Sequence, residues 1–138
     1  MSILPSVFKE SIQQKLTNEF TAFERSLEEL SPVSIRINPR KQNNIRAEAR
    51  VPWSEFGFYL TERPKFTFDP LFHAGTYYVQ EASSMFLEQV FKHHIAGKSL
   101  NLLDLSAAPG GKSTHILSLI DDTSLLVSNE VIRARATI

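Results

Sequence analysis

Residues 102–115 read LLDLSAAPGGKSTH, and this stretch decides the fold of the chain. A short apolar run leads into two alanines, a proline and two glycines. Gly110 and Gly111 carry no side chain, so the backbone can turn sharply there and approach a ligand closely. The helix expected over 112–120 offers unpaired N–H groups and the positive end of its dipole to a phosphate or carboxylate. The stretch therefore predicts a ligand-binding turn between a strand and a helix.

A second strand and an acid extend this pattern. Apolar residues predict strands over 100–105 and 124–128, and Glu130 follows the second strand, 26 residues past Asp104. In nucleotide-binding βαβ units, an acid about 20 residues beyond the glycine turn accepts hydrogen bonds from a ribose. The order of strand, glycine turn, helix, strand and acid predicts the first βαβ unit of a Rossmann-like domain.

Three ligand classes compete for the glycine turn. A phosphate-binding P-loop requires the pattern G-x-x-x-x-G-K-[ST], and Ser106 stands where its first glycine is required. The adjacent glycines do not fit the G-x-G-x-x-G pattern of dinucleotide-binding proteins. S-adenosylmethionine has an amino-acid end and a ribose, and residues 106–112 with Glu130 meet its demand for a small-residue turn and a downstream acid. A glycine turn without any ligand is the remaining alternative.

The N-terminal half has periodicities of its own. Apolar residues recur at spacings of three and four over 5–30, which predicts one long helix whose apolar face packs in a core. Alternation over 33–37 predicts a half-buried strand, and the aromatic-rich residues 53–60 are expected to end in another strand. A helix is predicted over 81–94, with an apolar face formed by Met85, Phe86, Val90 and Phe91.

Charge is asymmetric in one segment only. The 138 residues hold 15 Lys and Arg against 15 Asp and Glu, which excludes a strongly basic protein. Residues 36–50 nevertheless carry an excess of four positive charges, enough to neutralise several phosphates, although an ordinary solvated loop has the same composition. The chain lacks a signal peptide pattern and a membrane-spanning apolar run, so we expect a cytoplasmic protein without membrane contact.

The stretch DLSAAPGGKSTHI, followed by SNEVIRARA, resembles the Sun (Nol/Nop) family of RNA cytosine-C5 methyltransferases. The upstream stretches SIRINPRK and GTYYVQEASSM resemble two further family segments, so the resemblance covers roughly residues 33–136. The family often has cysteine where this chain has Ser106. Asp104 is expected to brace the loop rather than touch ligand. The resemblance implies an S-adenosylmethionine site made of Ser106, Ala107, Ala108, Pro109, Gly110, Gly111, Lys112 and Glu130.

The resemblance also implies an RNA substrate, with ribosomal RNA preferred over transfer RNA. The segment implied to contact the RNA backbone contains Arg36, Arg40, Lys41 and Arg46. In the family a cysteine adds to carbon 6 of cytosine, which activates carbon 5 toward the methyl group, and a second cysteine helps to release the product. This chain has no cysteine, so we expect no catalytic residue in it and no activity of the chain alone.

These observations predict an incomplete α/β chain, the N-terminal part of a methyltransferase. Residues 1–72 are expected to form a small α+β domain that contacts RNA, and residues 73–138 the truncated start of a Rossmann-like cofactor domain, without a metal site. Two parallel strands would leave an open edge and apolar faces, so we expect a dimer or an exchange of elements. The alternative is a non-catalytic RNA-binding accessory domain that kept a cofactor-like loop.

Overall fold

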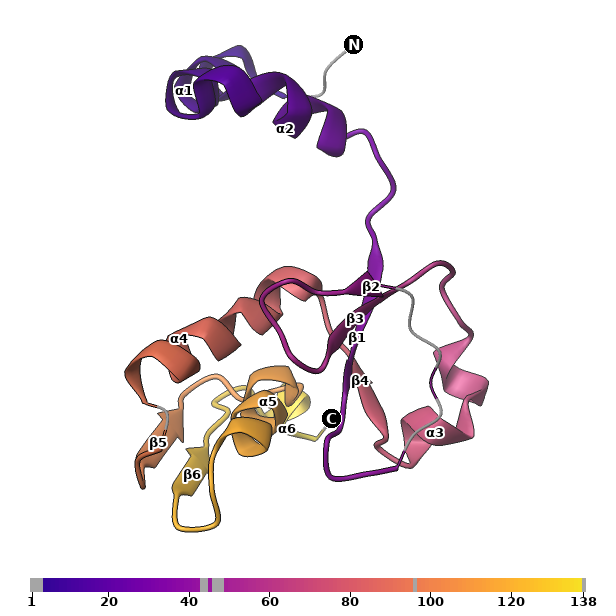
Figure 1. The fold of residues 1–138 in the computed structure, drawn as a ribbon, viewed down its shortest axis with the longest axis vertical. Coiled ribbons are helices and arrows are strands. Elements are labelled where there is room, and N and C mark those ends of the chain that lie inside the picture. The colour runs from indigo at the N-terminus through magenta and orange to yellow at the C-terminus, as the bar shows by residue number, and fades with distance from the viewer. Residues whose placement is uncertain (1–3, 43–44, 46–48, 96, 138) are drawn as a thin grey trace. The chain divides into compact units, whose positions relative to one another are not determined.

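The computed structural model of the chain describes residues 4–42, 45, 49–95 and 97–137 (Figure 1). The chain forms two compact units, Met1–Ser31 and Pro32–Ile138. None of the helices within the described ranges has the length and apolar content needed to cross a bilayer.

The first unit contains two helices instead of the single predicted one. Helix α1 (Ser6–Leu16) is followed by the 3₁₀ turn η1 (Thr17–Glu19) and by α2 (Phe20–Ser26). Thr17 has φ +43°, a conformation that a β-branched residue rarely adopts and that ends α1. The prediction of one helix over 5–30 is therefore wrong. The expected core-facing side is also not buried within this unit, since neither helix has a buried residue in its described part.

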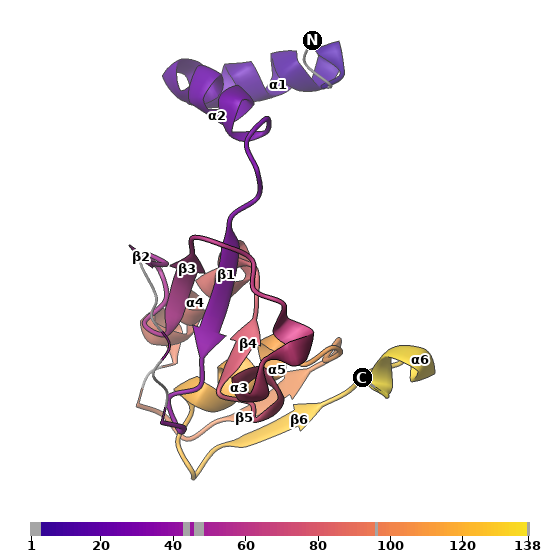
Figure 2. The same ribbon diagram turned by 90° about the vertical axis from the view of Figure 1, so that its right-hand side faces the viewer.

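An antiparallel sheet forms the centre of the second unit (Figure 2). Its strand order is β2-β3-β1-β4, with β1 (Val33–Ile37) in the interior. The other strands are β2 (Ala49–Arg50), β3 (Gly57–Leu60) and β4 (Tyr77–Val79). The predicted strand over 33–37 and the strand at the end of 53–60 are both confirmed.

Both faces of β1 are covered. On one face, Ile35, Ile37 and Tyr77 form an apolar cluster against the 3₁₀ turn η2 (Phe66–Phe68) and the short helix α3 (Pro70–His73). On the other face, the polar residues of β1 lie beneath helices, and they are buried as well. The prediction that this strand is half-buried is thus wrong, because a second layer packs on its polar side.

Part of that second layer is the 3₁₀ turn η3 (Ala82–Phe86) followed by helix α4 (Leu87–His94). Met85 is fully buried and packs against Gly57, where a Cβ atom would lie 2.5 Å from the Met85 sulfur. Phe91 is buried as predicted, whereas Phe86 and Val90 are 55% and 46% exposed. The predicted apolar face is wrong at these two positions, because a 3₁₀ turn advances each residue by more than an α-helix does and so rotates the face.

The predicted βαβ unit is confirmed. Strands β5 (Asn101–Asp104) and β6 (Leu125–Ser128) pair in parallel, and helix α5 (Gly111–Leu119) connects them before the short helix α6 (Arg133–Ala136). Helix α5 packs against α4, and its side chains reach both β1 and β6. Strand β4 pairs with β1, so the four-stranded sheet extends past the boundary predicted after residue 72. The assignment of the two parts to RNA and to cofactor remains a prediction.

A buried carboxylate ties α4 to its surroundings. Glu88 has no exposed surface and accepts hydrogen bonds from the Ser54 hydroxyl at 2.7 Å and from the Glu55 backbone N–H at 3.0 Å. Lys92 Nζ lies 2.7 Å from it, and His115 Nε2 on α5 lies 3.3 Å from it. Burial alone would raise the pKa of Glu88, but these hydrogen bonds outweigh burial and hold the pKa below its ordinary value.

His115 gives the second unit a dependence on pH. Burial lowers the pKa of His115, and the charge of Arg36 lowers it further against the attraction of Glu88. The unfolded chain binds this proton near the ordinary pKa of about 6.5, whereas the folded chain resists it. The stabilisation is therefore present above that pH and is lost as pH falls below it.

We expect the free energy of unfolding to fall between pH 6.5 and 5 by up to about 1.4 kcal/mol per pH unit from this group. His115→Gln, which keeps a donor toward Glu88, should flatten that slope, and the exposed His94→Gln should leave it unchanged. Urea unfolding followed by the fluorescence of the single tryptophan, Trp53, measures both. Equal slopes in the two variants would contradict the assignment.

Candidate functional site

The loop between β5 and α5 depends on two glycines for different reasons. Gly110 has φ +103°, a left-handed conformation that glycine adopts without a Cβ clash. Its N–H donates to the Ala107 carbonyl at 2.7 Å and closes the turn. Gly111 begins α5 with ordinary φ, but a Cβ there would lie 3.4 Å from the Tyr78 ring. One glycine permits the turn, and the other permits close packing against β4.

Asp104 braces this loop from the end of β5. Its carboxylate accepts from the Ser106 N–H at 3.1 Å and from the Ser113 hydroxyl at 2.7 Å. The Ser128 hydroxyl on β6 donates in turn to Ser113 at 2.9 Å. Asp104 is buried, so it holds both ends of the loop together, as expected from the sequence.

Glu130 lies against the same loop from the end of β6. Its carboxylate accepts from the Ala108 N–H at 3.2 Å and from the Ile132 N–H at 2.9 Å. The Ile132 N–H, the Ala108 N–H and the nearby Arg135 charge hold the pKa of Glu130 below its ordinary value. Arg135 also donates to the Ala108 carbonyl at 2.6 Å. An ionised carboxylate therefore stands beside the turn at neutral pH.

A cavity of about 320 Å³ opens between the loop and β6. Five of the eight predicted cofactor residues line it: Ala107, Ala108, Pro109, Gly110 and Glu130. Gly111 is not among the lining residues, and Ser106 and Lys112 are exposed outside the cavity. Ser113, Ser128 and Arg135 line it without having been predicted. The sequence signal for Arg135 was available, since SNEVIRARA places arginines three and five residues after the acid.

The chemistry of this cavity suits a ligand with an amino-acid end and hydroxyl groups. Its walls are mostly small side chains and backbone, with the Glu130 carboxylate, the hydroxyls of Ser113 and Ser128, and the Arg135 guanidinium as polar groups. Cofactor binding by these residues is a prediction that the geometry leaves open.

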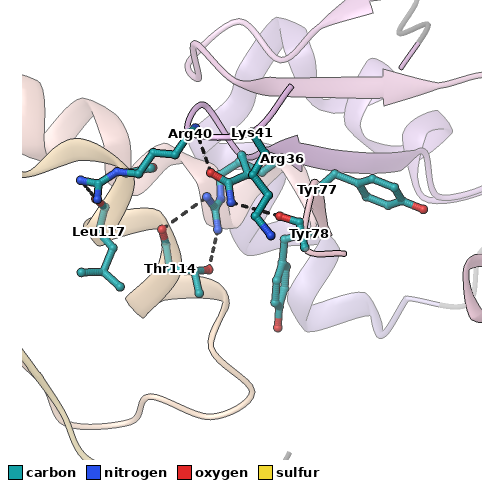
Figure 3. A pocket seen from close by; sticks show the side chains of 10 residues that line it. Arg36, Arg40, Lys41, Tyr77, Tyr78, Thr114 and Leu117 are labelled. Atoms are coloured by element: carbon teal, nitrogen blue, oxygen red, sulfur yellow. Dashed lines mark hydrogen bonds between the residues drawn. The ribbon is translucent and has the colours of Figure 1, made fainter. Parts of the chain in front are cut away.

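Two side chains of the four-stranded sheet, Arg36 and Tyr78, bond to the first turn of α5 and to the loop, and Figure 3 shows the Arg36 bonds to Thr114. Arg36 on β1 donates from Nε to Gln80 at 2.8 Å and from Nη2 to the Thr114 hydroxyl at 2.6 Å, and Nη2 lies 3.5 Å from the Gly111 carbonyl. The Tyr78 hydroxyl donates to the Pro109 carbonyl at 3.0 Å. Burial lowers the pKa of Arg36 to about 10, so the guanidinium stays charged at neutral pH.

This position changes the role expected of Arg36. It was predicted to contact the RNA backbone, yet it is only 4% exposed and donates to Gln80, which follows β4, and to Thr114 on α5. A buried guanidinium whose donors are already bonded to protein acceptors serves mainly to connect protein elements. Arg36 therefore joins the sheet to the first turn of α5, a function that the charge pattern did not reveal.

The other predicted basic residues lie beyond the end of β1. Arg40 and Lys41 are exposed and line, with Arg36, a second cavity of about 410 Å³ on the sheet side of α5. Arg40 Nη2 lies 3.5 Å from the Leu117 carbonyl and 3.7 Å from Asp122, while Lys41 Nζ donates to the Ala74 carbonyl. Arg46 falls outside the described residues. RNA contact by this segment remains a prediction.

Removing the Arg36 guanidinium should destabilise the second unit strongly. Arg36→Met leaves the acceptors of Gln80 and Thr114 without their buried donor, and each hydrogen bond from a charged group contributes about 1.5–3 kcal/mol. We expect a loss of roughly 2–4 kcal/mol in urea unfolding followed by Trp53 fluorescence. The matched variant Arg40→Met, at a side chain that is mostly exposed, should change stability by less than about 0.5 kcal/mol. Equal effects of the two variants would contradict the role of Arg36.

Comparison with known proteins agrees with this arrangement. The family model for the N-terminal domain of 16S rRNA methyltransferase RsmF matches residues 4–82. The ribosomal RNA small subunit methyltransferase F of Aeromonas salmonicida is 38% identical over an alignment of 91 residues that covers 62% of this chain and 19% of that protein. The corresponding protein of Vibrio campbellii is 31% identical over 153 residues, covering 98% of this chain and 31% of that protein.

A solved structure shares the fold. The crystal structure of a methyltransferase homolog protein from Pyrococcus horikoshii superposes with a TM-score of 0.76 at 26% identity, covering 98% of this chain and 47% of that one. The chain thus spans between a fifth and a third of the length of these two curated relatives. Because the family model matches more than half of its residues, the chain belongs to the family of the RsmF N-terminal domain, which confirms the Sun-family resemblance of its sequence.

Proposed function

We propose that this chain is the N-terminal region of a 5-methylcytosine methyltransferase that acts on ribosomal RNA and uses S-adenosylmethionine. The observation that carries the proposal is the cavity of about 320 Å³ in which the small-residue loop faces the ionised Glu130. The family supports the reaction class, since the relatives are named as ribosomal RNA small subunit methyltransferases.

The proposed cofactor would supply an electrophilic methyl group. The described residues fit its polar parts, because Glu130 offers a carboxylate to the ribose hydroxyls and α5 begins with N–H groups that suit a carboxylate. The alanines and Gly110 leave room beside the backbone. Asp104 and Arg135 hold the loop in the shape that this binding needs.

This chain would bind and orient rather than carry out the transfer. Carbon 5 of cytosine becomes nucleophilic only after a nucleophile adds to carbon 6, and the thiolate is the nucleophile of this family by resemblance. The sequence contains no cysteine, so no thiol of this chain can perform that step. We therefore expect no methyl transfer by the chain alone.

Calorimetry with S-adenosylmethionine tests the cofactor site. We expect weak binding by the chain and a further loss of about tenfold in Glu130→Gln, because the amide loses the charge that favours the ribose hydroxyls. The exposed Glu62→Gln removes the same charge elsewhere in the second unit and should bind like the wild type. Equal affinities of Glu130→Gln and wild type would remove the assignment.

Titration of ATP with magnesium into the same samples distinguishes an S-adenosylmethionine site from a phosphate-binding P-loop. Binding of ATP with magnesium, but not of S-adenosylmethionine, would favour the P-loop alternative. Binding of RNA without either small molecule would favour the accessory RNA-binding domain.

We also propose that two copies of this chain associate through the β5–β6 pair. Leu103 and Leu105 are 59% and 66% exposed there, and Leu125 and Val127 on β6 are also largely exposed. Such a cluster on a short open sheet favours association. Light scattering at micromolar concentration should give twice the monomer mass of 15.6 kDa. Leu103→Glu should shift the chain toward the monomer, whereas Phe68→Glu, at another exposed apolar residue, should not. A wild-type chain that is monomeric would refute the proposed association.

A further inference from the structure

We propose that the cavity of about 410 Å³ on the sheet side of α5, here called the cationic pocket, binds one nucleotide unit of single-stranded RNA. Its phosphodiester would lie among Arg40, Lys41 and Arg36, and its base would lie against the Tyr78 ring. The inference rests on the proposed function, since it names the part of the chain that would hold the substrate of the methyltransferase.

The charge of the cationic pocket is of one sign. Three cations line it, and no carboxylate is among the lining residues that the structure describes. Asp122 approaches Arg40 to 3.7 Å, but its side chain is almost fully exposed, so water screens its charge and it neutralises little of the charge of Arg40. An anion entering the pocket would therefore meet a positive potential that the protein does not neutralise itself.

The cations keep donors for a ligand. Arg40 and Lys41 contact the neutral carbonyls of Leu117 and Ala74, and the Arg40 contact is long at 3.5 Å. A guanidinium has five N–H donors and an ammonium has three, so most of them remain available to phosphate oxygens. Arg36 is largely committed to Gln80 and Thr114 and contributes mainly its charge.

The turn that carries Arg40 and Lys41 is held by hydrogen bonds. The Asn38 carboxamide accepts from the Arg40 N–H and donates to the Gly75 carbonyl, both at 3.0 Å. The Asn38 N–H donates to Thr76 at 2.8 Å, and the Lys41 N–H returns to Asn38 at 3.2 Å. These bonds hold the backbone of the turn at the mouth of the pocket before any ligand arrives, which lowers the entropic cost of binding.

The size and walls of the pocket favour a nucleotide over a bare anion. A volume of about 410 Å³ lies in the range of small-molecule sites and exceeds what one phosphate fills. Figure 3 shows Arg40 extending to one side of Arg36, the Lys41 side chain and the Tyr78 ring together on the other side, and the Thr114 side chain below Arg36. Positive groups beside an aromatic ring are the usual means by which proteins hold single-stranded nucleic acid without reading its sequence.

The cationic pocket is connected to the proposed cofactor site by hydrogen bonds, although the two cavities have no lining residue in common. Arg36 and Thr114 line the pocket and also join β1 to the first turn of α5, and Tyr78 lines the pocket while donating to Pro109 of the cofactor loop. A strand of RNA held here would therefore lie on the sheet side of the loop, and the cofactor on its β6 side. This arrangement separates the two ligands while keeping them on one helix.

Fluorescence anisotropy with a fluorescein-labelled deca-cytidylate RNA tests the pocket on the whole chain at 50–200 mM KCl, a range over which phosphate contacts change affinity measurably. Arg40→Gln with Lys41→Gln should weaken binding more than about tenfold and reduce the salt slope by about 0.7, which corresponds to one neutralised phosphate on a single strand. The control pair Lys65→Gln with Lys98→Gln removes the same charge from exposed sites in the second unit and should change affinity less than about threefold.

The Tyr78 ring is tested by two variants. Tyr78→Leu should weaken RNA binding by about tenfold, because stacking of one base contributes about 1–3 kcal/mol. Tyr78→Phe keeps the ring and loses only the hydrogen bond to Pro109, so it should retain the affinity for RNA. A loss in Tyr78→Phe as large as that in Tyr78→Leu would show that the loop contact, and not stacking, matters, and would overturn this part of the proposal.

Other outcomes would overturn the pocket as a whole. The first is that the wild type does not bind the RNA at the lowest salt, and the second is that the two charge-removal pairs lose affinity equally. The third is that poly-glutamate displaces the RNA as effectively as unlabelled RNA does, which would point to an acidic protein partner. Equal binding of cytidine monophosphate and of the decamer would point to a free nucleotide. Calorimetry with S-adenosylmethionine on Arg40→Gln with Lys41→Gln should match the wild type, so failure of the pocket and failure of the cofactor site are separately visible.

Discussion

The guanidinium of Arg36 is the contact on which the second unit depends. It leaves β1 on the polar face of the sheet and donates to Gln80, directly after β4, and to Thr114 on α5. A buried charge is tolerated only where hydrogen bonds replace water, and here the acceptors come from two different layers. This side chain therefore connects the sheet to the helix that follows the glycine loop.

The remaining polar contacts repeat this arrangement on a smaller scale. Asp104 accepts the Ser106 N–H at the start of the loop, and Glu130 and Arg135 pair with the N–H and the carbonyl of Ala108 in its middle. On the other side of α5, Glu88 receives donors from the loop at 54–55 and from His115. Because acceptors and donors on separate elements are paired in each case, the loop is shaped by the structure around it and not by its glycines alone.

Prediction from the sequence succeeded where a local pattern is sufficient. Alternation located β1, and the order of strand, turn and helix located the parallel pair β5–β6 within a residue or two. Prediction failed where a single residue ends a helix or where a neighbouring element sets which side chains are buried. Thr17 interrupts the expected N-terminal helix, and the η3 turn rotates Phe86 and Val90 outward. Of the candidate cofactor residues, five line one cavity, whereas Ser113, Ser128 and Arg135 join them only through folding.

The sequence by itself determined the type of loop, the acid that follows it and the family, because these depend on residue identity and short spacing. Only the tertiary structure decided what the charges do. Arg36 and Arg40 are four residues apart in one basic segment, yet one is buried between β1 and α5 and the other lies exposed at a pocket. Their difference arises because Arg36 points from β1 to the first turn of α5, which is distant in sequence, whereas Arg40 lies on the exposed turn beyond β1. Burial by a distant element leaves no local signal in composition or spacing.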